Sequence, residues 1–163
     1  MIVVADTSVV LNLVRVGHDA LLRRIYQEVW IPGKVAEEFV WQTSVNSRFR
    51  GLQLPPWLQI REPAAISQAL MANSLLDDGE RAALALALEI HADAILIDEE
   101  NGRAIAEKLG LEHVGILGIL FRAKADGFIP ALKPVVESLQ RDAGFWISDK
   151  LRNAVLKRAG EMA

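Results

Sequence analysis

The sequence predicts an α/β fold built on a mainly parallel β-sheet. Short apolar runs, such as residues 2–5 and 94–97, alternate along the chain with longer segments of helical pattern. Strands that alternate with helices in this way usually form parallel sheets. The chain has 163 residues, of which 52% are hydrophobic, and can therefore bury a substantial core. We expect one domain over residues 1–163, with a core over about 1–129 and a helical C-terminal extension over about 130–163.

The N-terminal half follows this alternation in order. Its expected elements are a strand at 2–5, helices at 8–15 and 19–28, a strand at 29–31, a helix at 33–42, a loop at 43–57, a strand at 58–60 and a helix at 64–73. Gly17 separates the first two helices, and Pro32 ends the second strand because proline has no amide to donate to a sheet. The loop is predicted from its polar composition and from its glycine and prolines.

The C-terminal half begins with a turn at 77–79. Its expected elements are a helix at 80–91, a strand at 94–97, a helix at 99–109, a strand at 112–114, a helix from Gly115 to about Gly127, and helices at 131–142 and 148–161. Alanine and leucine fill residues 80–91, and both are strong helix formers. Residues 94–97 have the continuous apolar character of a parallel strand that is buried on both faces.

The composition excludes several classes of protein. The chain has no cysteines, which rules out disulfide scaffolds, thiolate zinc sites and cysteine nucleophiles. No apolar stretch approaches the length of a membrane span, and the first residues read as a strand rather than a secretion signal. We therefore expect a cytoplasmic protein without membrane contact. With a net charge of −3, either nucleic acid is not the ligand, or acids gather at a metal site while local basic residues hold phosphates.

Asp6 and Asp98 occupy equivalent places in the pattern. Each ends a short apolar strand and precedes a helix. Ligands of open parallel sheets bind outside the carboxyl ends of the strands, so two carboxylates at these positions can converge there. The alternative is that each residue simply caps the helix that follows it, which aspartate does well.

Two further acids are candidates for the same place. Glu80 shares its helix face with apolar residues such as Ala83 and Leu84, so it lies on or beside the buried face. The alternative for Glu80 is a capping box with Asp77 at the N-cap, which would make Asp77 and the neighbouring Asp78 turn and cap residues rather than ligands. Either Glu37 or Glu38 supplies a fourth acid, and spacing alone barely separates the two.

Clustered carboxylates favour a metal site. Several carboxylates brought together repel one another unless a cation lies between them. Mg²⁺ and Mn²⁺ prefer oxygen ligands of this kind. A bound divalent cation lowers the pKa of water and stabilises charge that develops on a phosphate, which leads from an acidic cluster to phosphodiester hydrolysis.

Four motifs, taken in their order and spacing, resemble the PIN-domain superfamily. They are Asp6-Thr7-Ser8, Pro32-x-x-Val35-x-x-Glu38, Leu76-Asp77-x-Gly79-Glu80-x-x-Ala83-x-x-Leu86-Ala87 and Leu96-Ile97-Asp98-Glu99-x-x-Gly102-Arg103. Residues 115–120 and 123–129 are similar to those of its prokaryotic, toxin-related DUF3368 branch, and the resemblance extends over nearly the whole chain.

The resemblance implies a three-layer α/β/α sandwich around a central parallel sheet. It also implies a Mg²⁺- or Mn²⁺-dependent ribonuclease, often a toxin that a small antitoxin neutralises and often a homodimer. By position, Asp6, Glu80 and Asp98 match the metal-binding acids of the family. Glu38 matches the remaining acid and is favoured over Glu37, and Ser8 matches the hydroxyl residue that supports the first acid.

Some basic and aromatic residues are candidates for RNA contacts. Arg103, Arg122 and Lys124 could hold phosphates near the acids. Arg103 is the best placed of them, with an ion pair to Glu99 as the alternative. The four tryptophans are interpreted as packing or interface residues (Trp30, Trp41, Trp57, Trp146).

Three hypotheses follow from the sequence. The first is a metal-dependent endoribonuclease that uses Asp6, Glu38, Glu80 and Asp98. The second is an inactive or weakly active module that binds nucleic acid or protein. The third is an α/β domain that binds a small phosphorylated ligand at the same sheet edge.

Overall fold

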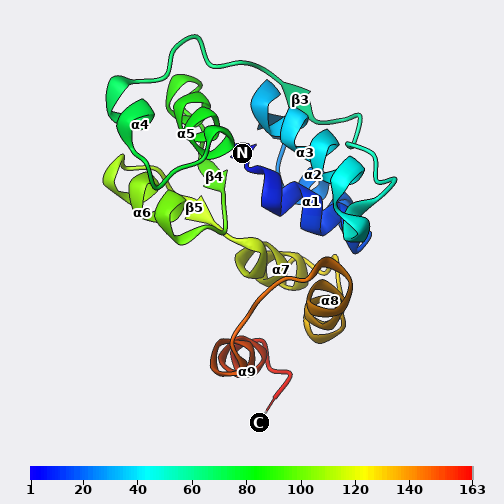
Figure 1. The fold of residues 1–163 in the computed structure, drawn as a ribbon. Coiled ribbons are helices and arrows are strands. Elements are labelled where there is room, and N and C mark those ends of the chain that lie inside the picture. Colours follow the sequence, from blue (N-terminus) through cyan, green and yellow to red (C-terminus); the bar gives the residue numbers. More distant parts are fainter. Residues whose placement is uncertain (163) are drawn as a thin grey trace.

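The computed structural model describes residues 1–162 and contains a five-stranded parallel sheet (Figure 1). The strands are β1 (Ile2–Ala5), β2 (Glu28–Ile31), β3 (Gln59–Ile60), β4 (Ala94–Leu96) and β5 (His113–Val114), in the sheet order β3-β2-β1-β4-β5. The direction of winding therefore reverses at β1. Ligands of such sheets bind beyond the carboxyl ends of the strands at this switch point, which here are β1 and β4.

The helices alternate with the strands as the sequence predicts. They are α1 (Thr7–Arg15), α2 (Ala20–Ile25), α3 (Gly33–Val45), α4 (Gln68–Ala72), α5 (Asp78–Glu89), α6 (Glu100–Lys108), α7 (Ile116–Ala125), α8 (Lys133–Ser138) and α9 (Asp149–Arg158). A 3₁₀ turn at Ser47–Phe49 follows α3, and a π-helical turn at Leu139–Ala143 follows α8. No helix in the described range, residues 1–162, combines the length and the apolar character needed to cross a membrane.

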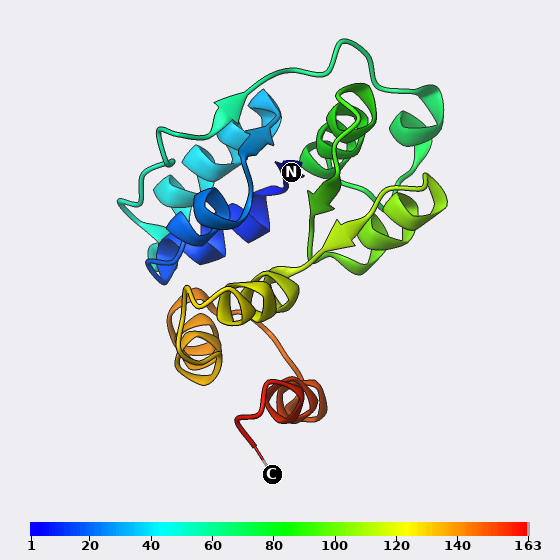
Figure 2. The same cartoon turned by 180° about the vertical axis from the view of Figure 1, so that it is seen from behind.

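Two cores lie on opposite faces of the sheet. Along β1, Val3 and Ala5 pack into one core and Val4 into the other, as alternating side chains of a strand must. The first core also contains side chains of α1, α2, α3, α7, α8 and α9, and the second contains those of α4, α5 and α6. Figure 2 shows both groups of helices from behind. The predicted α/β/α sandwich is confirmed.

Several element boundaries differ from the prediction. Residues 19–28 do not form one helix, because α2 ends at Ile25 and the amide of Gln27 donates to the carbonyl of Met1 beside the sheet. Helix α3 continues to Val45, into the predicted loop 43–57, and the hydroxyls of Thr43 and Ser44 donate back to the Val40 carbonyl within the helix. The predicted helix at 64–73 is confined to α4.

The C-terminal helices are fixed to the rest of the chain near Glu161. This carboxylate accepts hydrogen bonds from the amides of Leu132 and Lys133, at 2.8 and 2.9 Å, and from Nζ of Lys124 at 2.9 Å. Helices α7, α8 and α9 lie together below the sheet in the view of Figure 1. The segment between Gly144 and Ser148 joins the π-helical turn to α9, and part of it faces the carboxyl end of β4.

Candidate active site

Asp6 lies at the switch point of the sheet. Ala5 pairs with Leu96 in the parallel register, and the amide of Asp6 donates to the Leu96 carbonyl at 2.9 Å. The side chain is only 4% exposed and makes no capping hydrogen bond to α1. Its Oδ1 has no hydrogen-bond partner within residues 1–162. Capping therefore does not explain Asp6.

The surroundings of Asp6 favour its protonated form. Burial raises the pKa of the Asp6 carboxyl from 3.8 to about 8, and the nearby Thr7 amide only partly opposes this. The carboxylates of Asp77, Glu80 and Glu38 raise it further. In the absence of a cation, this group therefore holds a proton at neutral pH.

Glu38 joins three helices. Its carboxylate accepts hydrogen bonds from the Thr7 hydroxyl at 2.7 Å and from the Gly79 amide at 3.1 Å. A Cβ atom on residue 79 would lie 2.8 Å from Cδ of Glu38, so this close approach requires glycine. Glu37, by contrast, has a side chain 74% exposed and pairs with Lys34 at 3.6 Å. The structure thus directs Glu38, and not Glu37, towards the other acids.

Glu80 has the predicted capping role and also a free oxygen. Its amide donates to Oδ1 of Asp77 at 2.7 Å, and its Oε1 accepts from the Asp77 amide at 3.0 Å, which completes the capping box. Its Oε2 is buried without a partner in the described part of the chain. Burial is also the largest cause that raises the pKa of Glu80 to about 7. The cap interpretation is confirmed for one oxygen and leaves the second unexplained.

Asp98 caps a helix, although not the one that follows it. Its Oδ1 accepts a hydrogen bond from the Ile116 amide at 3.0 Å, at the start of α7. A Cβ atom on Gly115 would lie 2.5 Å from this oxygen. Burial raises the pKa of Asp98, and the Ile116 amide and the positive charge of Arg103 oppose the rise. Oδ2 is buried and has no partner within residues 1–162.

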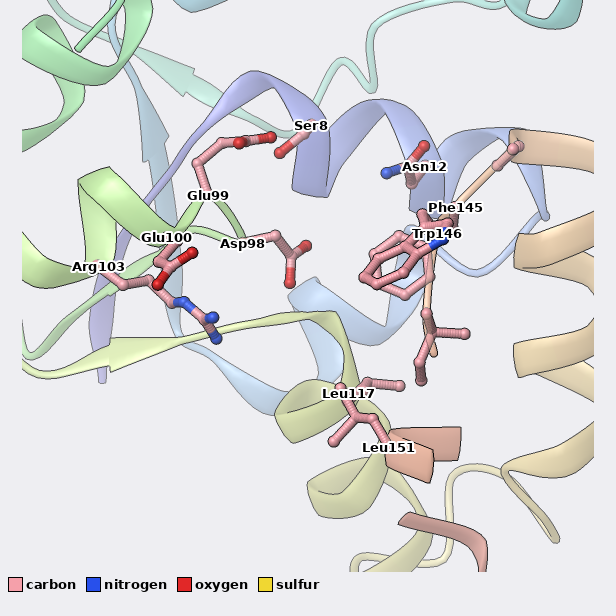
Figure 3. A pocket seen from close by; sticks show the side chains of 13 residues that line it. Ser8, Asn12, Asp98, Glu99, Glu100, Arg103, Leu117, Phe145, Trp146 and Leu151 are labelled. Carbon is pink, nitrogen blue, oxygen red and sulfur yellow. The ribbon is translucent and has the colours of Figure 1, made fainter. Parts of the chain in front are cut away.

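The predicted site residues other than Glu80, which lines neither, are divided between two adjoining pockets. The acidic pocket has a volume of about 310 Å³ and is lined by Asp6, Thr7, Ser8, Leu11, Glu38, Trp41, Gln42, Asp77 and Glu99. The tryptophan pocket has a volume of about 540 Å³, and its lining includes Ser8, Asn12, Asp98, Glu99, Arg103, Leu117, Phe145, Trp146 and Leu151. Figure 3 shows Asp98 and Trp146 across the second pocket from each other. Ser8 and Glu99 line both, so the two pockets are neighbours.

The acids do not form a ready-made metal shell. No group of three or more histidine, aspartate or glutamate side chains in residues 1–162 is arranged to hold a metal ion as it stands. That Asp6, Glu80 and Asp98 share one metal shell therefore stays a prediction. Asp98 directs one oxygen towards α7 and Glu80 directs one towards Asp77, which leaves one oxygen of each for a cation.

The unpartnered oxygens nevertheless belong to the predicted residues. Asp6, Ser8, Glu80 and Asp98 each have one buried side-chain oxygen without a hydrogen-bond partner in residues 1–162. One other side chain shares this property, Glu89, which lies 3.7 Å from Arg61 elsewhere on the molecule. Burying such groups is costly unless something satisfies them. Hard oxygen donors of this kind fit Mg²⁺ or Mn²⁺.

The sequence interpretation missed or misplaced several residues. Asp77, treated as a cap alone, also lines the acidic pocket and raises the pKa of Asp6 and Glu38. Arg122 and Lys124 are not near the acids, because they pair with Asp126 and Glu161. Arg103 lines the tryptophan pocket and makes no ion pair with Glu99 within residues 1–162.

Comparison with known proteins identifies a relationship over almost the entire chain. The family model DUF3368, described as a PIN domain, matches residues 2–161. The match includes every acid of the two pockets and extends through α9. No curated protein matches the sequence.

Proposed function

The chain belongs to the PIN-domain family, whose fold is of the nuclease type, and on this basis we propose that it is a metal-dependent endoribonuclease. The reaction is hydrolysis of phosphodiester bonds in RNA. The observation that carries the proposal is the set of free, buried oxygens on Asp6, Glu80 and Asp98 beside the ends of β1 and β4.

In this proposal Asp6, Glu80 and Asp98 hold the cation, Mg²⁺ or Mn²⁺, and Glu38 completes the site. The bound cation would neutralise the carboxylates, stabilise charge on the phosphate and lower the pKa of water. Thr7 and the Gly79 amide orient Glu38, and the Asp77 amide orients Glu80. The Ser8 hydroxyl, which has no hydrogen-bond partner within residues 1–162, is available to support the first acid, and Arg103 supplies a positive charge for a phosphate at the tryptophan pocket.

The second candidate is a PIN-like module that binds nucleic acid or protein without efficient catalysis. It is favoured by the separation of the acids, since no three of them in residues 1–162 already form a metal-binding group. The raised pKa values of Asp6 and Glu80 provide a test that distinguishes the two candidates, namely proton release on metal binding. A cation must displace protons from these groups, so metal binding by the enzyme should release protons and strengthen as pH rises.

The proposal includes a toxin-like role with a small antitoxin and a homodimer as partners. The feature that supports an interface is the outer face of α3, where Val40, Trp41 and Val45 are exposed apolar side chains. Exposed apolar patches often mark sites of protein contact. Light scattering that shows only an 18.0 kDa species at micromolar concentration would rule out the homodimer.

The experiment is cleavage of a mixed RNA pool by wild type, Asp6→Asn and Asp98→Asn, each with Mg²⁺, with Mn²⁺ and with a chelator. Wild type should cleave only with the cation, and both variants should lose cleavage and bind Mn²⁺ more weakly while they remain folded by circular dichroism. Glu37→Gln is the matched control and should cleave at the wild-type rate. Wild-type rates for the Asp6 and Asp98 variants would refute the metal mechanism, and an inactive wild type that still binds RNA would favour the second candidate.

A further inference from the structure

Trp146 is the most exposed of the large hydrophobic side chains in the described part of the chain, at 83%. It follows Phe145 in the short segment before α9, and both aromatic side chains line the tryptophan pocket together with Leu117 and Leu151. The sequence interpretation assigned the tryptophans to packing or interfaces, and an indole with this exposure does not serve the core of the chain. Trp146 lies beside a pocket that adjoins the acids, which is a suitable place for an aromatic side chain that binds a ligand.

The segment that carries Trp146 is held at both ends. Gly144 adopts a positive φ of 69°, and the guanidinium of Arg48 packs where a Cβ atom would otherwise lie. At the other end, the Ser148 hydroxyl accepts a hydrogen bond from the Leu151 amide at 3.1 Å and caps α9. Residues anchored in this way present an aromatic surface at a fixed place, which reduces the entropy lost when a ligand binds.

The opposite wall of the pocket carries Asp98 and Arg103 and leads to the acids. The pocket is also lined by Asn12, whose amide can both donate and accept hydrogen bonds. Figure 3 shows Asn12 beside the aromatic pair and Arg103 on the far side of Asp98. The volume of about 540 Å³ lies within the range of roughly 300–1,000 Å³ that is common for pockets that bind small ligands.

Charge limits how this surface can hold RNA. Among the residues that line the two pockets within residues 1–162, Arg103 is the one basic side chain, and the whole chain carries a net charge of −3. These two pockets therefore cannot neutralise several phosphates, which is the usual source of affinity for nucleic acid. Stacking of a base on an aromatic ring provides affinity without positive charge.

We propose that the tryptophan pocket binds an unpaired nucleobase of the RNA substrate, stacked on Trp146, next to the phosphodiester that is cleaved. Asn12 contacts the edge of the base, and Arg103 contacts a neighbouring phosphate. The inference rests on the proposed ribonuclease function and assigns one unpaired base of the substrate to this pocket, because the faces of paired bases are covered in a duplex. Trp146 is thus a substrate-binding residue.

The test measures binding and cleavage of a short, unstructured, fluorescent RNA by wild type, Trp146→Ala and Trp146→Phe. Binding is measured in the Asp6→Asn background, where cleavage is removed. Trp146→Ala should weaken binding about tenfold or more, and Trp146→Phe should restore most of it, since phenylalanine keeps an aromatic face. Met71→Ala removes another exposed apolar side chain, on α4 far from the pocket, and should change nothing.

A series of RNAs with one abasic nucleotide separates stacking from a structural effect. At one position of the RNA, loss of the base should weaken binding to the Asp6→Asn protein as much as Trp146→Ala does. The same abasic RNA should bind the Asp6→Asn, Trp146→Ala protein no more weakly than the intact RNA does. Equal losses for both proteins at every position would overturn the proposal.

The outcomes also separate this inference from the proposed function. Metal-dependent cleavage with equal RNA affinity for wild type and Trp146→Ala would overturn the stacking proposal alone, and would leave the pocket to a segment of a protein partner. Preference for duplex over single-stranded RNA would overturn it as well. Neither cleavage nor RNA binding by wild type would refute both.

Discussion

Asp6 follows β1 by one residue and Asp98 follows the neighbouring strand β4 by two, and the two carboxyls have different surroundings. The carboxyl of Asp6 faces Asp77, Glu80 and Glu38, and it makes no capping hydrogen bond. The carboxyl of Asp98 accepts a hydrogen bond from the start of α7 and lies near Arg103. Asp6 is therefore surrounded by other carboxyl groups, whereas the charge of Asp98 is partly neutralised by Arg103 and by the start of α7.

The difference shows that position in a fold and electrostatic role are separable. Both aspartates are brought to the sheet edge by the same strand-to-helix pattern. What distinguishes them is the element across from each one, namely the start of α5 for Asp6 and the start of α7 for Asp98. If this account is right, replacing the two carboxyls with amides should have unequal effects on stability.

The largest effect is expected from Asp6→Asn in the presence of a chelator. A carboxyl whose pKa rises from 3.8 to about 8 on folding takes up a proton as the chain folds. The metal-free protein should therefore lose stability as pH rises between those two values, by at most about 1.4 kcal/mol per pH unit for this group. Asp6→Asn should remove that loss, so it should be clearly more stable than wild type at pH 8 and similar to it near pH 4.

Asp98→Asn is the matched comparison. Its amide oxygen can still accept the Ile116 hydrogen bond, but the variant loses the attraction of Arg103 and of the α7 N-terminus for a negative charge. Relief of a buried charge and loss of these attractions oppose each other, so the change should be smaller. Urea unfolding of both variants in a chelator at several pH values measures this. Equal stabilisation by the two substitutions would remove the distinction between the two ends of the switch point.

Much of the fold was predictable because its signals are local. Apolar runs such as residues 94–97 and the Pro32 stop indicate strands, and the acids that follow β1 and β4 are visible in the sequence. The continuation of α3 through Thr43 and Ser44 was not predictable from polarity, because polar residues also occur inside helices when their hydroxyls bond back to a carbonyl of the preceding turn, as these two do to Val40. The helix predicted at 19–28 ends early because pairing beside the first strand competes with it.

The site was predictable in its residues but not in its arrangement. Spacing cannot reveal that Asp98 caps a helix 18 residues later in the chain, since that contact depends on how β5 and α7 return to the sheet. Nor can it reveal that Lys124 is engaged by Glu161, which lies 37 residues away in the sequence. The exposure of Trp146 likewise depends on where α9 packs. Each of these is a long-range contact, whereas motifs report local ones.

A smaller effect, on the rate of cleavage, is expected from Glu38, which lies among the carboxyl groups around Asp6. Glu38→Gln keeps its two contacts, since the amide oxygen can accept from Gly79 and the amide nitrogen can donate to the Thr7 hydroxyl. It removes one negative charge beside Asp6, so we expect cleavage to fall roughly 10- to 100-fold, the loss typical of groups that support a metal site. Glu37→Gln, one residue away and exposed, should not change the rate. Equal rates for both variants would exclude Glu38 from the site.

The smallest expected effect concerns the surroundings of Asp98. It compares the stability cost of adding a Cβ atom at two glycines that lie at helix starts, Gly115 and Gly33. A Cβ atom on residue 115 would lie 2.5 Å from Oδ1 of Asp98, whereas one on residue 33 would meet the carboxylate of Glu62. Glu62 is exposed and can move away, but Asp98 is only partly exposed and its Oδ1 is held by the Ile116 amide. Gly115 has an extended backbone, with φ −92° and ψ 177°, which alanine adopts without strain, so any cost must come from Asp98.

We therefore expect Gly115→Ala to destabilise the protein by about 1 kcal/mol, the usual value of a lost helix cap, and to lower cleavage because the Asp98 carboxylate is displaced. Gly33→Ala should be neutral or slightly stabilising, since alanine favours the helix in which it lies. A double-mutant cycle completes the test. In an Asp98→Ala background the cost of Gly115→Ala should vanish, because the oxygen that it displaces is gone. A cost that persists in that background would mean that Asp98 does not cap α7, and the contrast between the two aspartates would have to be explained by burial alone.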